Sequence, residues 1–544
     1  MTILDRVQSR NPFSAPTQFS ISAAQLVLIG ILVIAVFSRF WRLGDPAECY
    51  FDEVYFPTTA AEILHGKNDA WEFYGHENTH PPLSKEIMAL GEGIFGHESQ
   101  PLDNKCWPDQ ANASHRTDPD WTYKPYGWRF FGALAGVGAV LFMYLLAKKL
   151  FQSEIAGLAG AAFLTFDGLA LAQSRIATPD TYVLFFVLGA LYFLVLDRKR
   201  TFLLSGMFFG AASACKWIGA FTMAPIIVFL AFRIWRRVRE TPSDERLRTP
   251  ELALQIGAAI AGLGAFLAVF GAFVFGGFAA GVKTAAAPMV VALLFFGVAL
   301  ALIAFDKEAR RTPRGKVYLE AAWTFPVFFL AAPFVVYALT YIPMLLEGHG
   351  VAHAIDLNRQ AYEFHSSLNA THGYSSPWDT WPIMLRPIYF YVNDTGGAKI
   401  YSLGNPAVFW MGLPALAFLL FRGLRLNARL QLASWKTNIR GALDVAQWPL
   451  LFVVLGYIGM WLPWATQPRL LFIYHYLPAL AFVILALAYC VHYLWNHQSD
   501  WGRFAAVGTV VLAGITFAYF YPHLTAINVS HTLDESYYWI GSWR

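Results

Sequence analysis

The chain has 544 residues, of which 56% are hydrophobic and only 14% are charged, and its formal net charge is +4. Soluble domains carry about 25% charged residues, so this composition excludes an ordinary soluble domain and indicates a protein that lies mainly in lipid. The basic residues are found at the ends of apolar segments rather than on one face, which argues against nucleic-acid binding.

Apolar segments recur along the whole chain. A helix needs about 20 largely apolar residues to cross the hydrocarbon core of a membrane, which is about 30 Å thick. By this criterion we expect an all-α polytopic membrane protein with about 13 transmembrane helices, at residues 21–39, 129–147, 155–172, 179–196, 201–215, 217–233, 252–277, 286–305, 320–341, 407–422, 447–462, 471–490 and 504–521. No small-residue cleavage site follows the first segment, so we expect a retained anchor rather than a signal peptide.

The charges between these segments predict the orientation. Lys and Arg gather in alternate connections, at 148–149, 198–200, 233–239, 310–316 and 422–440. The positive-inside rule places these connections in the cytoplasm, together with the N-terminus, and places the C-terminus outside. The stretch 44–126 has 15 acidic and 5 basic residues and is expected to lie outside.

Two outer segments, 44–126 and 342–404, are too long to be simple turns. Long connections in a compact protein are either functional or disordered. These two are rich in Trp, Tyr, His and Pro, which favours a functional role over disorder.

The four cysteines have no metal-ligand spacing, but Cys49 and Cys106 fall in the first outer segment and could pair there.

Two adjacent carboxylates, Asp52 and Glu53, follow the first predicted span and are flanked by aromatic residues. Carboxylates at a membrane interface are costly unless they are paired or used in chemistry. One reading is therefore an interfacial ion pair with a nearby Arg or Lys. The other is a general base, because desolvation raises the pKa of a carboxylate and makes it a better proton acceptor.

His80 precedes two prolines in the same segment, and Lys85 follows them. Prolines restrict the backbone to an extended geometry, so we expect them to hold His80 in a defined place. A single histidine in a proline-stiffened turn is more often structural than catalytic. Its position in the same loop as Asp52 and Glu53 favours a functional reading.

Four cations map to the outer side against the positive-inside trend, namely Arg129, Arg175, Lys216 and Arg469. Arginine binds phosphate oxygens in a bidentate manner, and the phosphate of a lipid would lie at this depth. The structural alternative is an ion pair, such as Arg175 with Asp180.

A run of aromatic and hydroxyl residues lies in the second outer segment, from His372 to Pro382, and includes Trp378. Aromatic rings beside hydroxyl groups suit stacking on a sugar. Aromatic residues are also enriched at any membrane interface, so this run alone does not identify a sugar site.

In chain order these motifs resemble those of the protein O-mannosyltransferase family (glycosyltransferase family 39), membrane enzymes with the GT-C fold. The similar elements are Phe51–Val54, His80–Lys85, Arg129, Ala172–Arg175 with Asp180, Cys215–Gly219, Tyr374–Pro387 and Arg469 with His475–Pro478. The chain resembles the bacterial branch, because about 60 residues in the second outer segment leave no room for the β-trefoil module of eukaryotic members.

The chain also departs from the family pattern. It has more predicted spans than family members usually have, and the surplus is the Ala/Gly-rich pair at 252–305. We therefore expect an N-terminal GT-C catalytic module at 1–240, an extra transmembrane hairpin at 241–318 and a C-terminal module at 319–544.

The resemblance implies transfer of mannose from a polyprenyl-phosphate-mannose donor to Ser or Thr hydroxyls of exported proteins. On this basis our hypothesis is that Asp52 is the base, that Glu53 orients the acceptor, and that the anomeric carbon is inverted. Arg129, helped by Arg469 or Lys85, would stabilise the leaving phosphate, and Arg175 is a further candidate there. The expected substrate-binding residues are His80, Asp180, Lys216, His372 and Trp378.

The expected leaving-group cations are arginines, so the sequence demands no metal and no certain cofactor. We expect a bacterial plasma-membrane protein, with the secretion translocon as a candidate partner. Two alternatives remain. One is a related transferase with a lipid or glycan acceptor. The other is a transporter, which would place ionisable groups near mid-membrane rather than at the outer surface.

Overall fold

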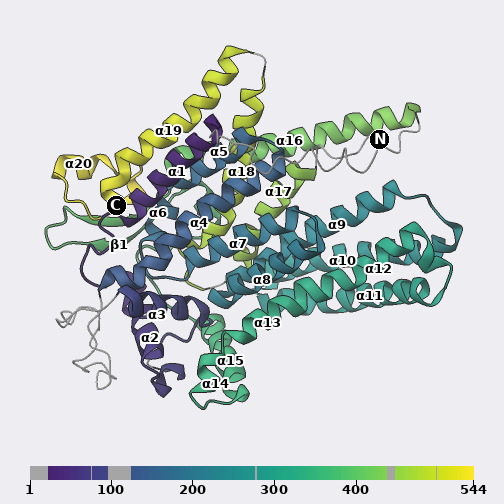
Figure 1. The fold of residues 1–544 in the computed structure, drawn as a ribbon, viewed down its shortest axis with the longest axis horizontal. Helices are drawn as coiled ribbons and strands as arrows, with labels where there is room; N and C mark the ends of the chain where they lie inside the picture. Colours follow the sequence, from purple (N-terminus) through teal and green to yellow (C-terminus); the bar gives the residue numbers. More distant parts are fainter. Residues whose placement is uncertain are drawn as a thin grey trace, which may run out of the picture.

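The computed structural model describes residues 22–74, 76–95, 124–275, 278–437, 448–467, 469–497 and 499–544, and the fold is mostly helical (77%). The helices form one elongated bundle with short helices and a small β-hairpin at one end (Figure 1). The predicted all-α membrane architecture is confirmed.

The first span and the first outer segment lead into the bundle. α1 (Ala23–Phe40) begins with a capping box, in which the Ser22 side chain accepts a hydrogen bond from Gln25 N and the Gln25 side chain accepts one from Ser22 N. The chain then forms a short 3₁₀ helix (Phe51–Val54), α2 (Phe56–Leu64), α3 (Leu83–Phe95) and the long α4 (Pro125–Phe151).

The helices after α4 are shorter and include one sharp bend. They are α5 (Glu154–Thr165), α6 (Gly168–Ser174), α7 (Asp180–Val195), α8 (Lys199–Cys215) and α9 (Met223–Glu240). α5 and α6 meet at 63°. The Asp167 side chain lies at this break and accepts a hydrogen bond from Ala170 N, which caps α6.

A helical hairpin follows, formed by α10 (Arg248–Phe275) and α11 (Phe278–Phe305). The two helices pack chiefly on each other and lie at the edge of the molecule, where α11 contacts α12 (Pro313–Pro326) (Figure 1). The next helix is α13 (Ala332–Leu339). A π-helical turn (Val327–Ala331) joins α12 to α13.

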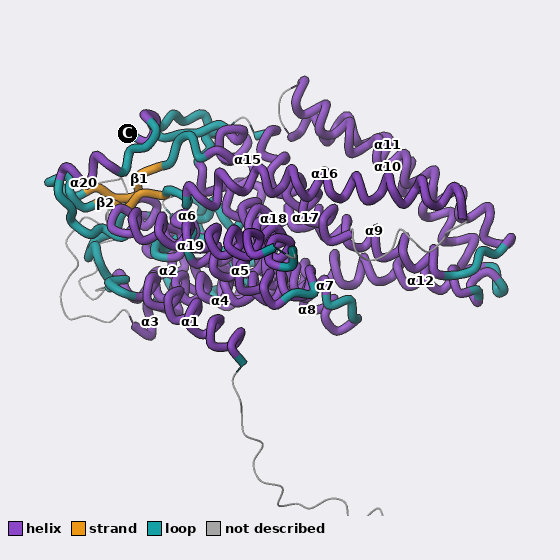
Figure 2. The backbone as a smooth tube through the Cα atoms, turned by 90° about the horizontal axis from the view of Figure 1, so that it is seen from above, coloured by secondary structure: helices purple, strands orange, loops and turns teal. Residues whose placement is uncertain are grey.

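The C-terminal part begins outside the bundle with α14 (Ile342–Leu346) and α15 (Val351–Ser367). It continues with the antiparallel strands β1 (Ile388–Val392) and β2 (Lys399–Ser402), then α16 (Pro406–Thr437), α17 (Trp448–Trp461), α18 (Leu477–Trp495), α19 (Asp500–Leu524) and α20 (His531–Ser536). The strands pair Ile388 with Ser402 and Val392 with Lys399, with a bulge between Tyr389 and Tyr391. Figure 2 shows this hairpin and α20 at one end of the molecule, and α12 towards the other end.

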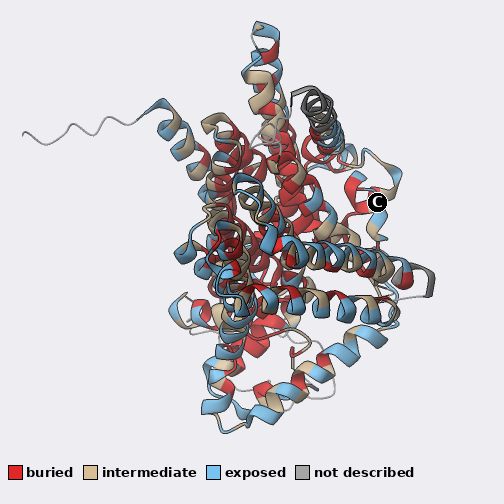
Figure 3. Ribbon diagram, turned by 90° about the vertical axis from the view of Figure 1, so that its right-hand side faces the viewer, coloured by how far each residue is buried: buried red, intermediate tan, exposed pale blue. Residues whose placement is uncertain are grey.

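α18 lies at the centre of the core. In the most apolar 18-residue stretch of the span that contains α18, 72% is buried inside the protein. The corresponding share in α1 is 17%. α18 packs against α5, α16, α17 and α19, and Figure 3 shows the buried residues gathered along the middle of the bundle. Leu26, Val27 and Val33 of α1 are exposed. A large exposed apolar surface of this kind is what a membrane would cover.

The predicted number of 13 spans is not confirmed. The described residues contain 10 helices that are long and apolar enough to cross a membrane, or 11 if the bent α5–α6 pair is one span. Each predicted segment does contain a helix, but three of them miss the criterion. The segment 155–172 is broken at Asp167, α7 has 16 residues, and α8 has 17.

Both predicted outer segments contain ordered structure in their described parts. The first holds α2 and α3, and the second holds α14, α15 and the β-hairpin. Cys49 is disulfide-bonded, whereas Cys215 and Cys490 are free thiols. Cys106, the predicted partner of Cys49, lies outside the described residues.

Candidate functional site

Asp52 lies in the 3₁₀ helix that follows the first span. The preceding residue, Phe51, has a φ of 53°, and its ring stacks on Phe390 at 4.7 Å and meets Tyr474 edge-on at 6.0 Å. These contacts fix the backbone beside the carboxyl group. Burial raises the pKa of Asp52 to about 7; the charge of Lys216 opposes this shift, and the charges of Asp180 and Glu77 add to it.

An ion pair between Lys216 and Asp180 lies within electrostatic reach of Asp52. Lys216 follows α8 and Asp180 begins α7, so the packing of these two helices brings the side chains together. The Lys216 Nζ atom lies 3.0 Å from both carboxylate oxygens of Asp180 and 5.4 Å from the centre of the Tyr474 ring. The structure therefore pairs Asp180 with Lys216 rather than with Arg175.

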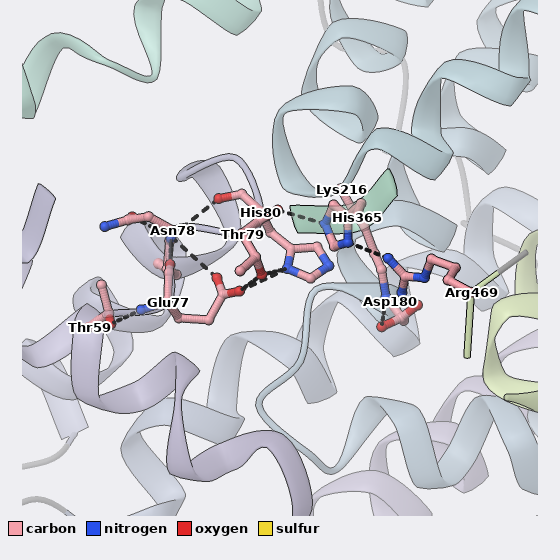
Figure 4. A network of polar contacts seen from close by, with 10 residues as sticks. Thr59, Glu77, Asn78, Thr79, His80, Asp180, Lys216, His365 and Arg469 are labelled. Atoms are coloured by element: carbon pink, nitrogen blue, oxygen red, sulfur yellow. Dashed lines mark hydrogen bonds and ion pairs between the residues drawn. The ribbon is translucent and has the colours of Figure 1, made fainter. Parts of the chain in front are cut away.

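His80 belongs to a hydrogen-bonded turn that Glu77 organises. The His80 Nδ1 atom lies 2.9 Å from Glu77 Oε1, and the Glu77 backbone N donates to Thr59 Oγ1 at 2.9 Å (Figure 4). Burial would raise the pKa of Glu77, but the charges of His80 and Lys85 and hydrogen bonds from His80 and Thr79 outweigh it and lower the pKa to about 2. Glu77 is therefore an anion that fixes the turn.

His365, near the end of α15, connects this turn to Arg469. Its Nε2 atom lies 2.8 Å from the Thr79 carbonyl oxygen, and its Nδ1 atom contacts an Arg469 Nη1 atom (Figure 4). A carbonyl oxygen only accepts hydrogen bonds, so Nε2 carries the proton and Nδ1 accepts from Arg469. Burial, together with the charges of His80 and Arg469, lowers the pKa of His365 to about 3, which keeps the ring neutral.

Arg469 keeps donors for a ligand. Among the described residues its hydrogen-bond partners are His365 and, at 3.5 Å, the Leu470 carbonyl oxygen. The side chain is half-buried, and the charge of Asp180 acts on it. We use the name polar cluster for the seven residues Asp52, Glu77, His80, Asp180, Lys216, His365 and Arg469.

Arg129 and Glu53 form a separate, fully buried ion pair. The Arg129 Nε and Nη2 atoms donate to the two Glu53 oxygens at 2.8 and 2.7 Å. The remaining donors of Arg129 bind the carbonyl oxygens of Leu43, Pro46 and Glu48. This geometry does not fit the predicted roles, because Arg129 has no donor left for a phosphate and Glu53 is not open to an acceptor.

Arg175 and Lys85 are also occupied by the protein itself. Arg175 Nη1 and Nη2 donate to carbonyl oxygens at the end of α1 and just beyond it, those of Ser38, Arg39, Trp41 and Arg42. Lys85 is buried and donates to the Glu77 carbonyl oxygen, to Asn78 Oδ1 at 2.9 Å and to the His80 carbonyl oxygen at 3.3 Å. In this structure the donors of both residues bind oxygen atoms of the protein, so the predicted phosphate-binding role of Arg175 and Lys85 stays a prediction.

The aromatic stretch of the second outer segment packs beside the Tyr474 segment. The Ser376 N atom donates to the Leu471 carbonyl oxygen at 2.9 Å, and the His372 ring meets the Phe472 ring edge-on at 5.2 Å. Trp378 packs on Trp461 at 4.8 Å. His372 is exposed and Trp378 half-buried, and no contact joins either of them to the polar cluster within the described ranges.

Three residues of the site had not been predicted: Glu77, His365 and Tyr474. Glu77 lies only three residues before His80, so the motif could have been extended to it. Tyr474 lies next to the His475–Pro478 element. His365 is one of several histidines in the second outer segment, and only the folding of α15 against the first segment brings it to Thr79.

The polar cluster combines a carboxyl group that titrates near neutral pH with cations held on the same side of the bundle. Such a site can accept a proton from a hydroxyl nucleophile and can stabilise an anionic leaving group. The donors are held by ion pairs and hydrogen bonds before any ligand arrives, which reduces the cost of reorganisation.

Comparisons with known proteins identify the family that the chain resembles. The family model described as "Dolichyl-phosphate-mannose-protein mannosyltransferase" matches residues 29–250, and "C-terminal four TMM region of protein-O-mannosyltransferase" matches residues 351–543. The chain is 26% identical to a polyprenol-phosphate-mannose–protein mannosyltransferase of Mycobacterium tuberculosis, over 94% of this chain and 91% of the relative. A relative of the same description from Mycolicibacterium smegmatis is also 26% identical, over 94% and 92%.

A solved structure has a similar fold. The Saccharomyces cerevisiae protein O-mannosyltransferase Pmt1–Pmt2 complex bound to the sugar donor aligns with a TM-score of 0.68 at 14% identity, covering 97% of this chain and 93% of that chain. This likeness shows the GT-C fold.

Proposed function

The chain belongs to the protein O-mannosyltransferase family, and we propose that it transfers mannose from polyprenyl-phosphate-mannose to Ser or Thr hydroxyls of exported proteins, with inversion. The donor and the protein acceptor come from the names of its relatives. The observation that carries the proposal is the carboxyl group of Asp52, whose pKa is raised to about 7 beside the cations of the polar cluster.

Asp52 is the proposed general base. The acceptor hydroxyl oxygen attacks the anomeric carbon of mannose from the face opposite the phosphate, and a bond forms between this oxygen and the carbon. The bond from the carbon to the phosphate oxygen breaks, and polyprenyl phosphate leaves with that electron pair. The hydroxyl proton passes to Asp52, whose raised pKa makes it a stronger base than an ordinary aspartate.

Arg469 is the proposed contact for the leaving phosphate. His365 accepts one of its hydrogen bonds and so fixes the direction of the guanidinium, while other donors stay available. A preorganised cation at a developing negative charge is worth several kcal/mol, about 3 to 4 for one oxyanion-hole donor. Lys216 adds positive charge, although Asp180 partly neutralises it.

The other predicted residues take supporting roles in this proposal. Glu53 and Arg129 anchor the backbone on either side of Asp52, and Arg175 caps α1. Lys85 and Glu77 hold His80, which faces His365 with ring centres 5.2 Å apart. His372 and Trp378 are proposed to contact the sugar or the acceptor when substrates are bound.

The proposed setting is a bacterial plasma membrane, with the N-terminus in the cytoplasm and the polar cluster and C-terminus outside. We propose a division into a catalytic module at 1–240, a peripheral hairpin at 241–318 and a C-terminal module at 319–544. Exported polypeptides would reach the site as they leave the secretion translocon.

The function is tested by incubating purified protein with radiolabelled polyprenyl-phosphate-mannose and a Ser/Thr-rich peptide. We expect label on the peptide, released as mannose by β-elimination at alkaline pH. A parallel reaction with a lipid or glycan acceptor in place of the peptide is expected to stay unlabelled. Label on that acceptor alone would overturn the assignment of a protein acceptor.

A further inference from the structure

The first outer segment meets α14 and α15 at a second polar site, outside the polar cluster. A small apolar core joins the two segments here, formed by Ala70, Trp71, Tyr341, Met344 and Leu357. The Trp71 Nε1 atom donates to Glu347 Oε2 at 2.7 Å across the same contact. At its edge lie Glu72, His349 and His353.

We propose that Glu72, His349 and His353 bind a divalent transition-metal ion, best fitted by Zn²⁺, which fastens the first outer segment to α15. One ligand atom from each of the three side chains lies within 4.8 Å of the other two. Two imidazoles and one carboxylate are a ligand set that zinc uses, with water in the fourth position.

Hydrogen bonds already set the tautomer that a metal needs. The Nε2 atoms of His349 and His353 lie 2.8 and 2.9 Å from the carbonyl oxygens of Asn68 and Trp71. Since a carbonyl oxygen only accepts, each Nε2 carries the proton, and each neutral ring keeps a lone pair on Nδ1. Metal-bound histidines are usually held in this way, by a hydrogen bond from the other ring nitrogen.

The backbone places the three ligands without strain. Glu72 ends the 3₁₀ helix Asn68–Trp71, which also supplies both carbonyl oxygens. His349 precedes α15 and His353 lies in its first turn, where the two rings stack at 4.5 Å. Ligands of one zinc ion lie about 3.3 Å apart. Closing the site therefore requires small rotations of the exposed Glu72 side chain and of the two imidazole rings.

The metal would act on structure and not on the transferred sugar. α15 carries His365 at its other end, and His365 contacts Thr79 and Arg469 in the polar cluster. A metal that fixes the start of α15 against the first segment would thus stiffen the element that positions Arg469.

The test is zinc binding to purified, tag-free and metal-stripped protein, measured by calorimetric titration and by the melting temperature in detergent. We expect one Zn²⁺ per chain and a higher melting temperature with zinc, because a ligand that binds only the folded state stabilises it. Glu72→Gln and His353→Ala should each weaken binding by about tenfold or more and remove the thermal shift.

The choice of Glu72 and one control variant make the result decisive. The Glu72 side chain makes no hydrogen bond or ion pair with other described residues, so Glu72→Gln removes a ligand without breaking the fold. His531→Ala changes a histidine whose side chain is 89% exposed and should bind zinc like the wild type. The proposal is overturned if the wild type binds no zinc, or if Glu72→Gln and His353→Ala bind it as tightly as the wild type. No donor substrate is present, so neither result bears on the transferase function.

Discussion

Arg129 and Glu53 form a bidentate ion pair in which neither side chain is exposed to solvent. Glu53 Oε1 accepts a third hydrogen bond, from Ala177 N at 2.9 Å. The pair thus joins the start of α4, the 3₁₀ helix that carries Asp52, and the segment before α7. Of the two adjacent carboxylates, Glu53 therefore fixes the loop, and Asp52 is the one proposed to act as the base.

Removing either partner of this pair should destabilise the protein. Arg129→Ala and Glu53→Ala each leave a buried charge without its counterion, which typically costs about 3 to 5 kcal/mol. Thermal unfolding in detergent would show a clear loss. Arg359→Ala is the control, because its ion pairs on α15 are solvent-exposed and worth about 1 kcal/mol or less. An Arg129→Ala protein of normal stability that no longer binds donor would restore the predicted phosphate-binding role.

The rate of transfer should depend on pH through Asp52. Its ordinary pKa is 3.8, and the site raises it to about 7. Only the ionised carboxylate accepts a proton, so kcat/KM should rise tenfold per pH unit below about 7 and level off above it. A profile that is flat from pH 5 to 8, or that falls as the pH rises through 7, would be inconsistent with Asp52 as the base.

Arg469→Ala should lower turnover by about 100-fold or more, because a preorganised cation at the leaving phosphate is lost. Arg469→Lys keeps the charge and should recover part of the rate. Steady-state kinetics with varied donor would measure both variants, with Arg359→Ala as the matched surface control. Turnover within a few-fold of the wild type in Arg469→Ala would exclude this residue from the site.

His365 is a positioning residue in this account. His365→Leu removes the acceptor that directs Arg469, so kcat should fall while the affinity for the acceptor peptide stays unchanged. His365→Asn offers an oxygen at a similar place and should restore part of kcat. Equal rates in the two variants would show that the hydrogen bond to Arg469 does not matter.

The sequence predicted the membrane fold, because hydropathy and charge act over long stretches, and it also named most residues of the candidate site. Asp52, His80, Asp180, Lys216 and Arg469 were all predicted to act in or near the site, and the structure brings them together. The span count differed because the break at Asp167 and the lengths of α7 and α8 depend on packing inside the bundle, which an apolar run does not reveal.

The roles of the cations could not be predicted from the sequence. A cation at the outer end of a helix can face a ligand or a backbone carbonyl group, and the residue type is the same in both cases. Arg175 caps α1 and Lys85 caps the turn at His80, whereas Arg469 retains donors that no described residue occupies. For the two arginines the difference lies in contacts between residues more than a hundred positions apart, Arg175 with Trp41 and Arg469 with His365.

Asp52→Asn is the sharpest test of Asp52 as the general base, because it keeps the size of the side chain and removes the base. In the assay with radiolabelled donor and peptide, we predict a loss of about 100-fold or more, with unchanged thermal stability and donor binding. Asp379→Asn, a change at an exposed acid in the second outer segment, should transfer mannose normally. Transfer by Asp52→Asn at a rate near that of the wild type would contradict the account.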